Sequence, residues 1–191
     1  MMNQRLKIAA VCGSLRKDSF NKKLLQAIEE EAKDQWEMTF MEIGTLPLFN
    51  EDLEKEGDPE EVVAFRDQLR EADGVLIITP EYNSGIPGGL KNALDWASRP
   101  PRKAVLNGMP AAVAGATPGS GGTGLSQMQL RQTLVAMNVN VMSAPKVLVG
   151  EVHKKINHET MKLEDERTLT HLQGFIHGFT EFVELYKGKG S

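Results

Sequence analysis

Continuous apolar runs of strand length recur along the chain. Such runs are typical of strands that are covered on both faces, as in a parallel sheet between layers of helices. The runs lie at residues 6–11 (LKIAAV), 74–80 (GVLIITP) and 110–116 (PAAVAGA), and 38–43 and 138–150 are two further candidate strands. The pattern predicts five strands.

Between these runs, apolar residues return every three or four positions, which is the spacing of one helix face. Leu24, Leu25, Ile28 and Ala32 form the first such stripe. Further helical segments follow Pro59 and occupy parts of 90–98, 125–137 and 172–186. Strands that alternate with helices predict an α/β fold with a parallel sheet that is covered on both faces.

Composition and charge narrow the class of protein. The 191 residues suit one domain, 1–191, with 40% hydrophobic and 25% charged residues, as in ordinary globular proteins. A net charge of -4 argues against a nucleic-acid binder with a broad basic face, and no apolar run is long enough for a membrane span. The apolar start of the chain is too short for a signal peptide, so we expect a cytoplasmic protein.

The loop after the first strand reads GSLRKDSFN (13–21) and leads into a helix. Free backbone N–H groups and the positive end of the helix dipole favour phosphate there. Ser14, Ser19 and Asn21 add short polar side chains, and Arg16 adds a forked cation. On this loop alone, an equally weighted interpretation is that Ser19 only caps the helix and Arg16 is solvated.

The loop after the third strand, TPEYNSGIPGG, contains more turn-forming residues than a simple connection needs. Its glycines and prolines allow close approach to a flat ligand, to which Tyr82 and Asn83 would add an aromatic ring and an amide. The alternative is a rigid turn or a subunit contact. Two such loops after neighbouring strands favour one shared ligand site at the carboxyl edge of the sheet.

Together, GSLRKDSFN (13–21) and PEYNSGIPGGLKNALDW (80–96) closely resemble the NADPH-dependent FMN reductase family, flavodoxin-like proteins that include quinone and chromate reductases. The order of strands, loops and helices agrees from residue 5 to 186. The resemblance implies a three-layer sandwich whose five-stranded parallel sheet has the order 2-1-3-4-5. It also implies FMN as cofactor and NAD(P)H as co-substrate.

The resemblance further implies a cofactor site of three loops. In the first loop, Ser14, Arg16, Ser19, Phe20 and Asn21 would cradle the FMN phosphate, and in the second Pro80, Glu81, Tyr82 and Asn83 would border the isoalloxazine ring. In the third, Thr117, Pro118, Gly119, Ser120 and Gly121 would approach the ring from its other edge, mainly through backbone atoms. Ser84 departs from some relatives, which have tyrosine there.

The expected activity is hydride transfer from NAD(P)H through FMN to a small-molecule acceptor such as a quinone, with chromate, azo compounds or free flavin as other candidates. Because the flavin carries the chemistry, no side chain is required as a catalytic residue, and donor and acceptor would alternate at one flavin face in a ping-pong scheme. Two alternatives remain, a flavodoxin-type electron carrier and a flavin-binding regulatory protein without significant turnover.

Assembly and nucleotide binding are two further expectations. The family resemblance implies a homodimer or homotetramer, and we expect the loop YNSGIPGG and the adjoining helix with Trp96 to present the contact surface. Arg99 and Arg102, in the segment SRPPRK, are candidates for attracting a nucleotide phosphate, although such a segment is more often an exposed linker.

Other patterns carry less weight. Gly119, Gly121 and Gly124 spell G-x-G-x-x-G, but the acidic residue that a dinucleotide-binding fold needs about 20 positions later is missing. His153 and His158 lack a third ligand, so we expect no metal site, and the other two histidines are expected at surface or packing positions. Cys12 is expected to be a core residue and is the chain's one cysteine, which excludes an internal disulfide.

Overall fold

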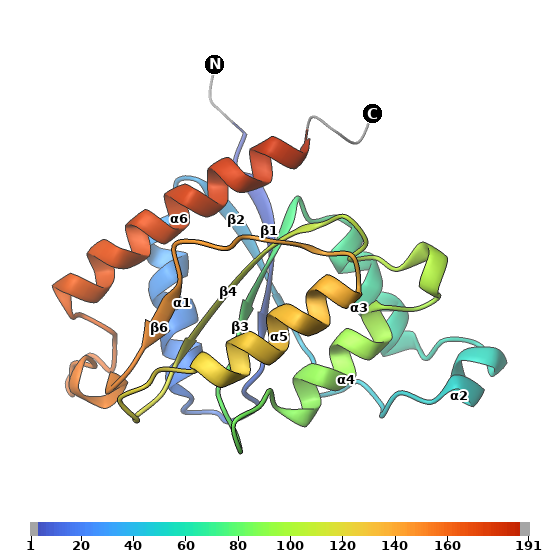
Figure 1. Cartoon of the computed structure of the whole chain (residues 1–191), viewed down its shortest axis with the longest axis horizontal. Helices are drawn as coiled ribbons and strands as arrows, with labels where there is room; N and C mark the ends of the chain where they lie inside the picture. Colours follow the sequence, from blue (N-terminus) through green and yellow to red (C-terminus); the bar gives the residue numbers. More distant parts are fainter. Residues whose placement is uncertain (1–3, 188–191) are drawn as a thin grey trace.

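Six parallel strands form one sheet at the centre of the computed structural model, which describes residues 4–187 (Figure 1). The strands are β1 (Leu6–Cys12), β2 (Trp36–Met41), β3 (Gly74–Ile78), β4 (Pro110–Ala116), β5 (Asn140–Val141) and β6 (Val147–Val149). The α-helices are α1 (Phe20–Ala32), α2 (Glu51–Glu56), α3 (Glu60–Arg70), α4 (Gly88–Ala97), α5 (Gly124–Ala136) and α6 (Glu166–Lys187), and the 3₁₀ turns are η1 (Pro101–Lys103) and η2 (Val152–Lys154).

The strand order is β2-β1-β3-β4-β5, and β6 also pairs with β4. The predicted order 2-1-3-4-5 is therefore confirmed, but the predicted fifth strand is divided in two. Pro145 lies between β5 and β6 and has no N–H group to donate to a neighbouring strand, which favours a break in the pairing here.

Strand β2 begins two residues earlier than the predicted 38–43, at Trp36, which pairs in register with Leu6. The indole of Trp36 is buried, donates a hydrogen bond of 2.8 Å to the Thr180 hydroxyl and packs edge-on against Phe179 at 5.6 Å between ring centroids. These contacts with α6 hold the start of β2 in the sheet.

The two faces of the sheet carry separate cores, as the period of two along a strand requires. On β1, Leu6, Ile8 and Ala10 face a layer made by α1 and α6, whereas Ala9 and Val11 face the layer of α3, α4 and α5. Figure 1 shows these two helix layers on opposite sides of the sheet. Both faces are buried, which explains the continuous apolar runs.

Trp96 on α4 corrects one expectation, because its relative exposure is 0%. Its indole N–H donates to the Pro47 carbonyl at 2.8 Å, its ring packs edge-on against Phe49 at 4.9 Å, and the Arg66 guanidinium lies 5.7 Å from its centroid. Trp96 therefore belongs to the core and offers no surface for a subunit contact.

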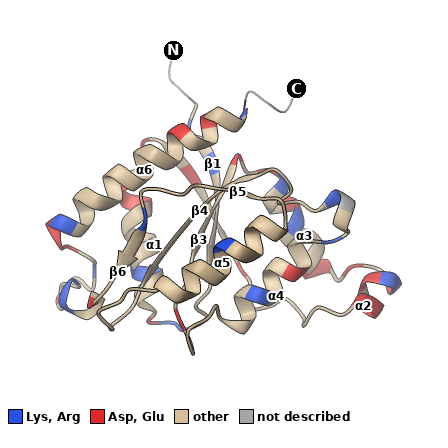
Figure 2. Ribbon diagram, viewed as in Figure 1, with Lys and Arg blue, Asp and Glu red and all other residues tan. Residues whose placement is uncertain are grey.

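Charge is unevenly distributed over the helices. Acidic residues gather on the short helix α2, whereas α5 carries one charged residue, Arg131 (Figure 2). Within residues 4–187, none of the helices is both long enough and apolar enough to cross a membrane.

Candidate functional site

Three loops follow the carboxyl ends of β1, β3 and β4, and parallel strands bring them to one edge of the sheet (Figure 1). We call them loop 1 (residues 13–19), loop 2 (79–87) and loop 3 (117–123). Loops 1 and 2 approach so closely that a Cβ atom on Gly13 would lie 3.0 Å from Leu90 and 3.3 Å from Pro80. The sequence-predicted flavin residues are therefore brought together at this edge.

Loop 1 offers unused donors at the start of α1. The backbone N–H groups of residues 15–18 make no hydrogen bond with any residue in the described range 4–187. Arg16 is exposed and makes no ion pair within that range, and the hydroxyl of the buried Ser14 is likewise without a partner there. Such donors at a helix N-terminus suit a phosphate group.

Ser19 and Asn21 position loop 1 through their own hydrogen bonds. Ser19 is the N-cap of α1, and its hydroxyl accepts from the Asn21 backbone N–H at 3.1 Å. The buried Asn21 amide donates to the Ala116 carbonyl and accepts from the Ala116 N–H, both at 2.9 Å. Asn21 thus ties the start of α1 to the end of β4. Phe20 is half-buried and packs against the α1–α6 core.

The tip of loop 2 is a tight turn. Tyr82 and Gly85 exchange backbone hydrogen bonds of 3.0 and 3.1 Å, and the two residues between them, Asn83 and Ser84, have φ values of 50° and 61°. Two consecutive positive φ values are typical of a type I′ hairpin turn. The turn leaves Tyr82 49% exposed.

Helix α5 holds loop 2 at two points. One Glu81 carboxylate oxygen accepts from the backbone N–H groups of Leu125 and Ser126, at 2.9 and 3.0 Å, and so caps the first turn of α5. Gln129, one turn further along, accepts from the Ile86 N–H at 2.8 Å. The carboxylate of Glu81 therefore serves to fix the two elements, a role that sequence reasoning missed because its partners lie 44 positions away or more.

A buried hydroxyl pair supports this arrangement. The side-chain oxygens of Thr79 and Ser126 are 2.8 Å apart, and each hydroxyl donates to the Pro80 carbonyl oxygen at 2.8 Å. Loop 2 therefore leaves the sheet in a fixed direction at Pro80, which is buried.

Loop 3 is held by the chain that follows β6. Thr117 accepts from the Val152 N–H at 3.1 Å, and Gly119 accepts from the Glu151 N–H at 2.9 Å. In contrast, the N–H groups of Ser120, Gly121 and Gly122 have no hydrogen-bond partner among the described residues. Pro118, Gly119, Ser120 and Gly121 are exposed. Loop 3 can thus offer backbone donors, as its glycine content predicts.

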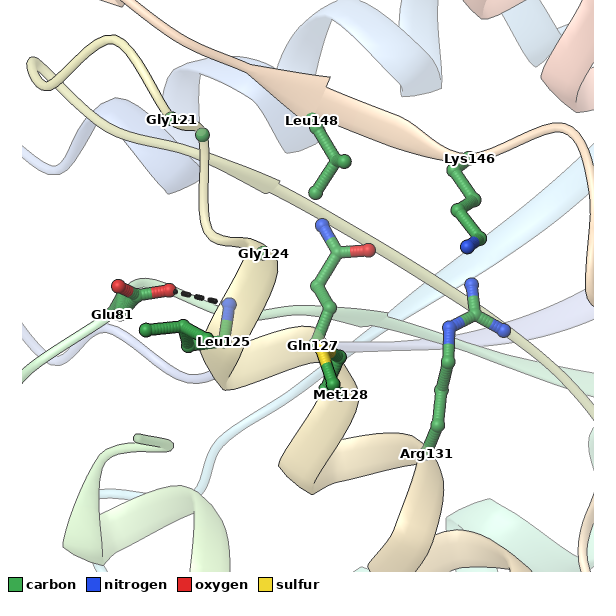
Figure 3. A pocket seen from close by; sticks show the side chains of 10 residues that line it. Glu81, Gly121, Gly124, Leu125, Gln127, Met128, Arg131, Lys146 and Leu148 are labelled. Atoms are coloured by element: carbon green, nitrogen blue, oxygen red, sulfur yellow. Dashed lines mark hydrogen bonds between the residues drawn. The ribbon is translucent and has the colours of Figure 1, made fainter. Parts of the chain in front are cut away.

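A pocket of about 380 Å³ lies beside loops 2 and 3 against α5 (Figure 3). Glu81 and Gly121 line one end, and Leu125, Met128 and Leu148 form much of its wall. Figure 3 shows the side chains of Arg131 and Lys146 at the other end. We call it the α5 pocket.

The donor set fits FMN. Loop 1 provides a cluster of free N–H groups and a cation for a phosphate, and loop 3 provides free N–H groups for the polar edge of a flat ring. The space beside Gly121 is open, since a Cβ there would meet nothing within 4 Å.

Arg99 does not join the loops. It lies beyond the carboxyl end of α4, whose ten residues span about 15 Å from loop 2. Its guanidinium contacts Glu54 at 2.8 Å and Glu51 at 3.7 Å and stacks on Phe49. The charge of Arg99 is therefore already paired with α2, which argues against a role toward a nucleotide. The side chain of Arg102 lies outside the described part.

The remaining singled-out residues are the four histidines and Cys12. The four histidines are exposed, as expected; His171 contacts the Lys146 carbonyl at 2.7 Å, and His177 lies 3.5 Å from Glu181. Cys12 is half-buried at the end of β1, and burial raises the pKa of its thiol. A protonated, packed thiol is poorly suited to act as a nucleophile.

Comparisons with known proteins bear on the family of the chain. The family model of the NADPH-dependent FMN reductases matches residues 6–154. A quinone reductase from Pseudomonas putida is 41% identical over 185 residues, which cover 96% of this chain and 98% of the relative. A 2-hydroxy-1,4-benzoquinone reductase from Burkholderia is 40% identical over 178 residues, covering 93% and 96%.

Solved structures show the same fold. FerB, a flavoenzyme NAD(P)H:acceptor oxidoreductase from Paracoccus denitrificans, superposes with a TM-score of 0.88 at 38% identity and covers 95% of this chain and 98% of its own. An archaeal flavodoxin superposes with a TM-score of 0.59 at 12% identity, covering 94% and 99%, a likeness of fold alone.

Proposed function

The chain belongs to the NADPH-dependent FMN reductase family, and from that premise we propose that it transfers a hydride from NAD(P)H through bound FMN to a quinone. The net reaction converts NAD(P)H, a proton and a quinone into NAD(P)⁺ and a hydroquinone. The observation that carries the proposal is the convergence of three loops, two with unused backbone donors, at the carboxyl edge of the sheet.

FMN, when bound, supplies the two-electron chemistry, and the chain supplies binding and orientation. The free N–H groups of residues 15–18, the Ser14 hydroxyl and Arg16 would hold the phosphate. Pro80, Tyr82 and Asn83 would border the ring, and the N–H groups of Ser120 and Gly121 would face its polar edge. Asn21, Ser19 and Glu81 would act as positioning residues, because their polar groups already bind other parts of the chain.

The phosphate assignment is tested by replacing Arg16 with alanine. A charge-assisted hydrogen bond contributes about 1.5–3 kcal/mol, so FMN affinity should fall about ten- to a hundredfold. Lys17→Ala removes the neighbouring exposed cation of the same loop and serves as the matched control, with an expected change below about threefold. Fluorescence titration of the apoprotein with FMN measures both, and equal effects in the two variants would remove Arg16 from the site.

Donor and acceptor would use one flavin face in turn. All three loops open at a single edge of a one-domain chain, so the oxidised nucleotide would have to leave before the quinone enters. Steady-state rates with NADPH and a quinone should therefore give parallel double-reciprocal lines. Intersecting lines would overturn the shared site. Chromate, azo compounds and free flavin remain further candidate acceptors.

Assembly into a homodimer or homotetramer is part of the proposal. The outward face of α5 exposes Leu125, Met128 and Val135, with Met128 at 68% and Val135 at 66%. The Leu125 N–H at its start binds Glu81, the neighbour of the exposed Tyr82 in loop 2. A second copy of the chain would cover this apolar stripe and come close to the flavin loops. Sedimentation at micromolar concentration should give at least a dimer, whereas a fully active monomer would refute it.

The proposal also gives a location and separates the rival functions. NAD(P)H is available in the cytoplasm, so that is where the protein would work. Rapid NADPH oxidation by the purified protein with a quinone distinguishes a reductase from a flavodoxin-type carrier or a flavin-binding regulatory protein. Negligible turnover in the presence of bound FMN would favour either of those alternatives.

A further inference from the structure

The α5 pocket holds two cations that have no acidic partner in the described part of the chain. Arg131 donates one hydrogen bond of 2.6 Å to the Met142 carbonyl, and neither its guanidinium nor the Lys146 ammonium forms an ion pair within residues 4–187. Arg131 is half-buried, and this burial lowers the pKa of its guanidinium. Two unpaired cations at one end of a pocket make the local potential positive, although the chain has a net charge of -4, and they would attract an anion there.

Gln127 provides a second, independent observation. Gln127 is buried, with a relative exposure of 3%. Its amide nitrogen donates to the Thr123 hydroxyl and the Val147 carbonyl. Its carbonyl oxygen is buried without a hydrogen-bond partner among the described residues. Figure 3 shows this oxygen turned toward the end of the pocket where Arg131 and Lys146 lie. An unpaired buried acceptor requires a donor.

The rest of the lining is mostly apolar and reaches the flavin loops. Leu125, Met128 and Leu148 form the wall, while Glu81 and Gly121 at the opposite end belong to loops 2 and 3. Because Leu125 and Met128 also belong to the stripe assigned to a second copy, the pocket would lie at the edge of that subunit contact. A volume of about 380 Å³ is in the range of small-molecule sites. The occupant should therefore have a flat apolar body and an anionic oxygen for the cations, and a hydroxyl that stays protonated would in addition donate to Gln127.

We propose that the α5 pocket is a specificity site for electron acceptors that carry an ionised oxygen, such as hydroxylated quinones, with Lys146 and Arg131 as the anion-binding residues. This inference rests on the proposed quinone reduction. A nucleotide phosphate shares the anionic chemistry, but the apolar wall favours an acceptor with an aromatic body.

The test compares two quinones of similar size. 2-Hydroxy-1,4-naphthoquinone is ionised at neutral pH, whereas 2-methyl-1,4-naphthoquinone is neutral. In Lys146→Gln the ratio of kcat/KM for the ionised quinone to that for the neutral quinone should fall about three- to tenfold, the effect of one partly exposed charge contact. Lys146→Glu should lower the ratio further, and Lys146→Arg, which keeps the charge, should keep it within about twofold of the wild type.

Lys55→Gln is the control, because it removes the same charge from exposed helix α2. A ratio that falls as much in the control as in Lys146→Gln, or that stays unchanged across the Lys146 series, would overturn the proposal. A rise in the KM for NADPH equal to that for the ionised quinone would assign the cations to the nucleotide instead. If the Lys146 variants lost their oligomeric state and kcat/KM fell equally for both quinones, the pocket would be a subunit contact and the proposal would be wrong.

Direct binding makes the test independent of turnover. Equilibrium dialysis with 2-hydroxy-1,4-naphthoquinone should show a weaker affinity in Lys146→Gln than in wild type and Lys55→Gln, and equal affinities would refute the pocket. Absence of NADPH oxidation with either quinone would count against the proposed function alone, while the dialysis would still decide on the anion site.

Discussion

Replacing Asn21 by alanine should destabilise the chain more than its position near the surface loops suggests. The Asn21 amide makes two hydrogen bonds of 2.9 Å, one to the N–H and one to the carbonyl of Ala116, and the side chain is buried. Each backbone group that loses its buried partner costs about 1–3 kcal/mol, so the free energy of unfolding should fall by about 2–6 kcal/mol. For a chain of this size, the melting temperature should fall by about 4–24 °C.

Chemical denaturation of the apoprotein measures the change without any contribution from a bound cofactor. Asn107→Ala is the matched control, because the Asn107 side chain is exposed and accepts a hydrogen bond from another surface side chain, that of Asn138. Its effect should stay within about 0.5 kcal/mol. If Asn21→Ala lost no more stability than Asn107→Ala, the two bonds to Ala116 would not fix loop 1 to β4.

A second variant gives the hydrogen-bond model a pH signature. Asn21→Asp keeps an acceptor for the Ala116 N–H but places a carboxylate oxygen against the Ala116 carbonyl. At neutral pH this variant should be at least as unstable as Asn21→Ala. Protonation of the new carboxyl restores a donor, so the stability gap to the wild type should narrow as the pH falls below the raised pKa of that group.

Three further outcomes are expected. Gly115→Ala should fail to yield folded protein, because the new Cβ would lie 2.0 Å from the Thr123 hydroxyl, while Gly121→Ala, which meets nothing within 4 Å, should fold normally by circular dichroism. Ser84→Gly should raise the free energy of unfolding by about 0.5–1 kcal/mol by relieving the positive φ of 61°, and a loss of stability would exclude a strained turn. Burial raises the pKa of Cys12, so iodoacetamide should alkylate the native thiol more slowly than the urea-unfolded one at pH 8.5. As the pH rises past 9.0, the unfolded chain loses the thiol proton first, so wild-type stability should fall relative to Cys12→Ser; equal pH profiles would contradict the shift.

Local patterns were sufficient for much of the fold and for the three loops that form the candidate site. The buried strands and amphipathic helices follow from apolar periodicity, and loops 1 to 3 follow from turn-forming residues at strand ends. Arg99 lies away from the three loops for a geometric reason, because a ten-residue helix separates it from loop 2. Its role toward a nucleotide stays a prediction.

Side-chain roles that depend on distant partners could not be found this way. Asn21 binds a residue 95 positions away, and Glu81 caps a helix that begins 43 residues later. Sequence alone places both among polar loop residues that could equally face a ligand. Trp96 was misplaced for a related reason, since its hydrogen-bond acceptor, the Pro47 carbonyl, belongs to a segment without periodic structure.

Because loop 2 is attached to α5 at two points, a movement of the helix would move the loop. Glu81 and Gln129 hold the two arms of the Tyr82 turn to α5, so a tilt of the helix would carry the turn with it. The apolar stripe of the same helix, formed by Leu125, Met128 and Val135, is the surface that a second copy would contact. Subunit association and the orientation of Tyr82 would then be mechanically coupled, and dilution would alter the environment of the Tyr82 ring before it unfolded the chain.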